Sequence, residues 1–159
     1  MQRLILPLPG NEVFASELAR QSRGELGTVE TRRFPDGETY VRLHGMPNGR
    51  PVDLICTLAR PDAQFLALTF AADAARDLGA SEVNLVAPYL AYMRQDARFH
   101  PGECISSRSF ARLISATFDR LVTVDPHLHR HAALTSLYTI PATTLHAAPL
   151  LSSWISANV

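Results

Sequence analysis

Apolar and polar positions follow two different periods along the chain. Short apolar runs bounded by turn residues are typical of buried strands, whereas apolar residues three or four apart are typical of amphipathic helices. The short runs predict strands at residues 4–8, 28–34, 40–43, 52–58, 83–87, 121–124 and 140–145. Residues 129–137 fit either a short helix or a turn.

Helical spacing occurs between these strands. A first helix follows Asn11, with Phe14 and Leu18 on one face and Gly24 after its end. A second helix spans residues 62–78, and a third precedes the strand at 121–124. The positions expected to face inward are Phe65, Leu68, Ala72 and Ala75 in the second helix, Phe110, Leu113, Ile114 and Thr117 in the third, and Leu150, Leu151, Trp154 and Ile155 in a last helix at 148–157.

This order of elements predicts one α/β domain. Its 159 residues contain no repeat or linker-like segment, and strands alternating with helices indicate a mostly parallel sheet flanked by helices on both faces, with about five strands. The central unit runs from Val83 to His127, where two apolar strands enclose one helix. Such a βαβ unit is typical of a parallel sheet, whose ligands bind outside the carboxyl ends of the strands.

Two polar clusters follow the strands of this unit. The triplet Arg94-Gln95-Asp96 comes after the first strand, and Asp125-Pro126-His127 comes after the second. Both clusters are therefore expected at the same edge of the sheet, within the span of one nucleotide. Arginine suits phosphate groups and Gln95 offers a donor and an acceptor, so a polyphosphate ligand fits this edge.

The segment Phe34-Pro35-Asp36-Gly37-Glu38 has the composition of a turn. Two interpretations remain open from the residues alone. The carboxylates of Asp36 and Glu38 could hold a metal or an amine, with Phe34 stacking on the ligand. Alternatively, the segment is a solvent-exposed hairpin turn without a ligand.

His127, His129 and His131 form an alternating series. On an extended segment all three would face one side and could bind a transition metal. A turn at Pro126 is the other reading of the same segment, and it would separate them.

Composition excludes some functions. The formal net charge is zero, so nothing indicates a nucleic-acid surface or an anionic membrane partner. All fifteen basic residues are arginine, which excludes any mechanism that needs a lysine of this chain. Cys56 and Cys104 show no paired spacing, and neither a signal peptide nor a membrane-spanning run is evident, so a cytoplasmic location is expected. No Walker A, GxGxxG or GxSxG motif is present.

Three stretches together resemble a known family: FPDGETYVRL at residues 34–43, PYLAYMRQDARFHPGECISSRSFARLI at 88–114, and VTVDPH at 122–127. They are similar to the amino-terminal half of ribose-phosphate pyrophosphokinase, also called phosphoribosyl pyrophosphate synthetase. The similarity covers essentially the whole chain. It implies a type I phosphoribosyltransferase-like domain, and residues 1–159 would be the amino-terminal domain with the carboxyl-terminal half absent.

The resemblance implies a kinase of nucleotide biosynthesis. The family transfers the diphosphoryl group of ATP to ribose 5-phosphate, giving phosphoribosyl pyrophosphate and AMP, and assembles as dimers or hexamers. By similarity Phe34, Asp36 and Glu38 would reach the adenine of ATP bound by a neighbouring subunit. Arg94 and Gln95 would contact the nucleotide of their own subunit, with Asp96 close by. His127 would meet Mg²⁺ and the ATP phosphates, supported by Asp125.

The sequence departs from the family pattern in several ways. The family's ribose 5-phosphate loop and catalytic lysine belong to the carboxyl-terminal half, so this chain is expected to hold no catalytic residue and to be inactive alone. Pro126 replaces a leucine between Asp125 and His127, and the segment His100-Pro101-Gly102 differs from that of ADP-inhibited members. One alternative is a non-catalytic scaffold homologue that associates with active subunits. A stand-alone phosphoribosyltransferase is disfavoured, because no acidic-pair phosphoribosyl-binding loop is present.

Overall fold

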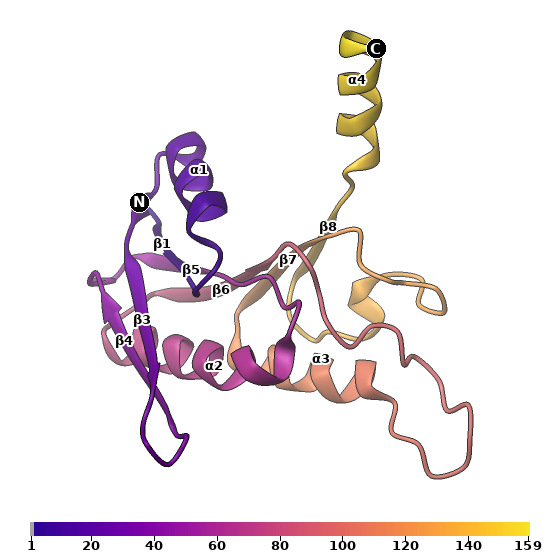
Figure 1. Cartoon of the computed structure of the whole chain (residues 1–159), viewed down its shortest axis with the longest axis horizontal. Coiled ribbons are helices and arrows are strands. Elements are labelled where there is room, and N and C mark those ends of the chain that lie inside the picture. The colour runs from indigo at the N-terminus through magenta and orange to yellow at the C-terminus, as the bar shows by residue number, and fades with distance from the viewer. Residues whose placement is uncertain (1) are drawn as a thin grey trace.

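The computed structural model describes residues 2–159 as a twisted sheet with helices on both faces and a protruding hairpin (Figure 1). The elements are β1 (Leu4–Pro7), α1 (Glu12–Ser22), β2 (Glu25–Leu26), β3 (Thr28–Arg33), β4 (Thr39–His44), β5 (Pro51–Ile55), α2 (Pro61–Asp77), β6 (Glu82–Ala87), α3 (Ser106–Thr117), β7 (Arg120–Val124), the 3-10 turn η1 (Leu134–Ser136), β8 (Ala142–Leu145) and α4 (Ala148–Asn158).

The main sheet has six strands in the order β2-β1-β5-β6-β7-β8, and each pair of neighbours is parallel. The predicted fold class is therefore confirmed, with six strands in place of about five. The additional strand β2 has only two residues, too few to give a pattern. Strands β3 and β4 form a separate antiparallel hairpin.

Side chains alternate between the two faces of the sheet, as a strand's period of two requires. Leu4 and Leu6 point into the larger core, which contains the buried faces of α2 and α3. Ile5 and Ile55 point to the opposite face and pack against Ala15 and Ala19 of α1. Figure 1 shows α1 on one side of the sheet and α2 with α3 on the other.

Two of the predicted inward faces, those of α4 and α3, need correction. All four apolar positions of α4 are exposed, from 52 % at Ile155 to 75 % at Leu150. Figure 1 shows the reason, because α4 extends away from the sheet instead of packing on it. Leu113 is also half exposed, because the buried face of α3 centres on neighbouring residues such as Ile114. In α1 the predicted face with Phe14 is about half exposed at that residue, and Ala15 and Ala19 are the buried positions.

Among the described residues, no helix combines the length and the apolar character that crossing a membrane requires.

Candidate functional site

The loops after β6 and β7 enclose one cavity at the carboxyl edge of the sheet. The two strands pair in parallel, with Ala87 opposite Thr123, so both chains leave the sheet at the same edge. The cavity, here called the edge cavity, has a volume of about 430 Å³. Its lining comes from the end of β7 at Val124 and from both loops: Tyr89, Leu90, Met93 and Arg94 from the first, and Asp125, Pro126, His127, Leu128 and His129 from the second.

Arg94 and His127 therefore lie in the wall of the same cavity, as their positions after adjacent strands predicted. The Arg94 side chain is exposed, and the hydrogen bonds and ion pairs of the described residues leave its guanidinium without a protein partner. A guanidinium in this situation can donate a planar pair of N–H groups to a phosphate. The cavity thus offers an unpaired cation to an anionic ligand.

Gln95 and Asp96 are engaged with the protein itself. The Gln95 side-chain oxygen accepts a hydrogen bond from Ser106 Oγ at 2.5 Å, which fixes the loop to the first residue of α3. Asp96 is only 5 % exposed, and Arg130 Nη1 donates to its Oδ1 at 2.8 Å. Burial opposes ionisation of Asp96, but the Arg130 guanidinium outweighs it and holds the pKa of this carboxyl below its ordinary value.

Asp125 occupies the turn at the end of β7. Its φ of 40° lies in the left-handed region, which Asp tolerates better than most residues. This turn directs the carboxylate toward the start of α4, where Oδ2 accepts the Ala147 N–H at 3.1 Å and Oδ1 lies 3.0 Å from His146 Nδ1. The Ala147 amide and then the His146 ring lower the pKa of Asp125. Asp125 is thus an ionised carboxylate at the rim of the cavity.

The histidine series does not form a metal cluster. The rings of His127 and His129 stack with their centroids 5.8 Å apart, and both line the edge cavity, whereas His131 is not part of its lining. Within residues 2–159, no three His, Cys, Asp or Glu side chains gather closely enough to hold a metal ion.

The turn with Phe34, Asp36 and Glu38 is at the tip of the β3–β4 hairpin. The Glu38 amide donates to Asp36 Oδ1 at 3.1 Å, and the Phe34 amide donates to the Glu38 carbonyl at 2.8 Å, so the turn is held internally. Arg32 lies over the Phe34 ring at 4.7 Å, which leaves Phe34 39 % exposed. None of these residues lines the edge cavity, and Figure 1 shows the tip projecting away from the sheet. One chain therefore does not bring the two predicted clusters together.

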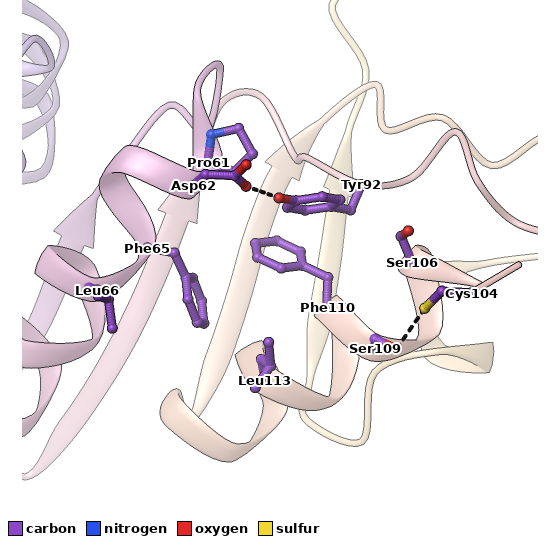
Figure 2. Close-up of a pocket in the computed structure, with 10 residues that line it drawn as sticks. All are labelled: Pro61, Asp62, Phe65, Leu66, Tyr92, Cys104, Ser106, Ser109, Phe110 and Leu113. Carbon is purple, nitrogen blue, oxygen red and sulfur yellow. Dashed lines mark hydrogen bonds between the residues drawn. The ribbon is translucent and has the colours of Figure 1, made fainter.

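A second cavity of about 310 Å³ lies between α2 and α3 (Figure 2). Three aromatic rings form its wall: the centroid of Phe110 is 5.3 Å from that of Phe65 and 4.8 Å from that of Tyr92. Tyr92 has a φ of 59° and donates its hydroxyl hydrogen to Asp62 Oδ1. Sequence reasoning treated Phe65 and Phe110 only as core residues and therefore missed this cavity. Its lining includes no cation, so the edge cavity fits phosphate better.

Comparisons with known proteins identify the family of the chain. A family model described as the N-terminal domain of ribose phosphate pyrophosphokinase matches residues 4–117. The ribose-phosphate pyrophosphokinase of Methanopyrus kandleri is 40 % identical over 139 residues, which are 87 % of this chain and 47 % of the relative. That of Halobacterium salinarum is 35 % identical over 156 residues, or 98 % of this chain and 54 % of the relative.

A solved structure supports the fold independently. The phosphoribosylpyrophosphate synthetase of Mycobacterium smegmatis superimposes with a TM-score of 0.87 at 22 % identity, covering 99 % of this chain and 53 % of the other. This chain spans about half the length of the curated relatives it matches. From the family match and these identities, the chain belongs to the ribose-phosphate pyrophosphokinase family.

Proposed function

We propose that this chain supplies the ATP-binding half of a ribose-phosphate pyrophosphokinase, which transfers the diphosphoryl group of ATP to ribose 5-phosphate. The observation that carries the proposal is the edge cavity, where the unpaired Arg94 guanidinium and His127 lie in one wall at the carboxyl edge of a parallel sheet. Membership of the family supplies the reaction.

In this reaction the 1-hydroxyl of ribose 5-phosphate gives up its proton to water and its oxygen attacks the β-phosphorus of ATP. The bond from that phosphorus to the α,β-bridging oxygen breaks, and AMP leaves with this oxygen. Negative charge is spread over the transferring group, so fixed cations and positioning provide most of the catalysis. Arg94 would bind the phosphates as a permanent cation. Gln95 would act by fixing its loop, since its oxygen is occupied by Ser106.

The residues present fit a magnesium ion that binds together with ATP. Mg²⁺ is typically held by one or two carboxylates, several waters and the substrate phosphates, without a dense protein cage. Asp125 has a lowered pKa and is half exposed beside His127, which suits that arrangement, whereas a resident metal would need more ligands. When bound, the ion would neutralise phosphate charge.

The hairpin tip would complete the site of a neighbouring copy. Phe34 is an exposed aromatic on a projecting turn, with the carboxylates of Asp36 and Glu38 beside it. Because the tip does not reach its own edge cavity, adenine contacts by these residues require self-association, at least as a dimer. The acceptor loop and the catalytic lysine would come from outside these 159 residues, so the chain alone would release no AMP.

Calorimetric titration with Mg-ATP tests the proposal. Wild-type protein is expected to bind, and Arg94→Ala to bind about tenfold or more weakly, because a charge-assisted hydrogen bond contributes about 1.5–3 kcal/mol. Arg112→Ala is the matched control, because Arg112 is an exposed arginine of α3 outside the cavity lining. No ATP binding by wild-type protein, or equal losses in both variants, would contradict the proposal.

A further inference from the structure

We propose that Arg130 is a positioning residue that holds the two walls of the edge cavity together through Asp96 and Phe99. The inference rests on the proposed function for its ligand, since the groups being positioned are those expected to meet ATP. The contacts of Arg130 that connect the two loops are made by protein residues alone.

The contacts of Arg130 join the loops next to their functional residues. Arg130 comes three positions after His127 on the second loop, and its Nη1 donates to Asp96 Oδ1 at 2.8 Å on the first. Asp96 is only two positions from Arg94. The Arg130 guanidinium also lies 5.5 Å from the centre of the ring of Phe99, which is on the same loop as Asp96. One side chain therefore restrains the first loop at two points.

No other ion pair joins these two loops among the described residues. A second link, between the Tyr138 hydroxyl and Met93 Sδ, is 3.8 Å long and of a weak type. The pair that Arg130 makes is thus the one charged link between the loops in the described part of the chain, beside the apolar packing of Met93 and Tyr138 in the core.

The two partners of the pair differ in burial, so substituting one or the other should have different effects. The Asp96 side chain is fully buried, and its Oδ2 has no hydrogen-bond partner in the described structure, whereas the Arg130 side chain is 49 % exposed. Removing Arg130 leaves a buried carboxylate without its hydrogen-bonded arginine and with only the neighbouring His131 as a positive group, which is unfavourable. Removing the charge of Asp96 leaves an arginine that water can solvate. Removing both charges should therefore be milder than removing Arg130 alone.

The test measures amide hydrogen exchange without ligand and Mg-ATP affinity on the same proteins. In Arg130→Gln, exchange in residues 94–103 and 127–131 should become about tenfold faster, and ATP affinity should fall by a similar factor. The double variant Asp96→Asn/Arg130→Gln should lie closer to wild type than Arg130→Gln. Arg130→Lys keeps the charge and should recover part of the affinity.

Arg120→Gln is the matched control, because it breaks an exposed ion pair with Glu82 at the opposite end of β7. It should leave exchange in both loops and ATP affinity unchanged. If Arg130→Gln does not alter loop exchange, or if Arg120→Gln weakens ATP binding equally, the positioning role is wrong. If Arg130→Gln does not fold, the same exchange measurement is made on Arg130→Lys and on the double variant. Exchange rates in the two loops equal to those of wild type in both variants would overturn the positioning role. Faster loop exchange together with no ATP binding by wild-type protein supports the role and contradicts the proposed function instead.

Discussion

Among the single residues predicted to bind the nucleotide, Asp96 is buried in the protein and does not line the edge cavity. Its folded pKa lies below the ordinary value of 3.8. The ionised carboxylate therefore contributes stability above the unfolded pKa, and this contribution is lost as pH falls through the lower folded value. We expect the stability difference between wild type and Asp96→Asn to be largest at neutral pH and to shrink at pH values below 3.8. Urea denaturation across that range measures it, and a difference independent of pH would contradict the assignment.

The location of a single residue was predictable from the sequence where the residue directly follows a strand of the sheet. Arg94 and His127 follow adjacent parallel strands, so the sequence was sufficient to place them at one edge. The partners of Asp96 and Asp125 were not predictable, because they depend on loop conformation. Arg130 lies 34 positions from Asp96 in the chain, and Asp125 reaches Ala147 only through its left-handed backbone. The roles assigned to these residues by resemblance stay predictions.

Among the elements, a polar network that joins the residue before β1 to the middle of β5 and to β6 gives a prediction independent of the site. Arg3 donates to both carboxylate oxygens of Asp53 on β5, at 2.6 and 2.8 Å, and Asn84 on β6 donates to Asp53 Oδ1 at 2.9 Å. Arg3→Gln should lower the free energy of unfolding by about 2 kcal/mol, because Asp53 is 8 % exposed and would lose its counter-charge.

Urea denaturation checks this value against Arg20→Gln, which removes an exposed pair with Glu17 on α1. The control should leave the free energy of unfolding close to that of wild type, because an exposed pair on a helix contributes little. Mg-ATP affinity should be unaffected in Arg3→Gln, because none of the three residues of the network lines the edge cavity. Equal effects of the two substitutions would show that the network contributes no more than a surface pair.

The buried face of a helix was predicted correctly where the helix packs against the sheet. In the predicted inward face of α2, Leu68, Ala72 and Ala75 are fully buried and Phe65 is partly buried. The same reasoning was wrong for α4, because spacing identifies an apolar face but not what covers it. The strand at 28–34 was found, but its period of two cannot show that it pairs only within the hairpin.

For the whole molecule, the order of elements was sufficient to predict an α/β domain with a parallel sheet. The strand order β2-β1-β5-β6-β7-β8 was not predictable, since non-local pairing is decided by packing. The separation between the hairpin tip and the edge cavity became clear only from the structure, whereas a site shared with a neighbouring subunit was already implied by the family resemblance. If that site is correct, each functional pocket needs two copies of the chain.

Mixing two defective variants tests the shared pocket directly. Phe34→Ala should weaken ATP binding about fivefold, since one stacking contact contributes about 1 kcal/mol. Arg94→Ala, as a separate variant, should weaken it by a larger factor. In a 1:1 mixture that exchanges subunits freely, half of symmetric dimers are mixed, and each mixed dimer has one intact pocket. Roughly a quarter of the pockets should therefore regain wild-type affinity.

The matched control mixes Phe34→Ala with the double variant Phe34→Ala/Arg94→Ala, in which no combination of subunits restores a pocket. Titration should find high-affinity sites in the first mixture and none in the second. Native mass spectrometry would verify that heterodimers form in both. If heterodimers form in the first mixture and no high-affinity sites return, the hairpin tip serves its own subunit or no nucleotide at all. A pocket within one subunit would then have to bring Phe34 to Arg94, which the projecting hairpin of this structure does not do.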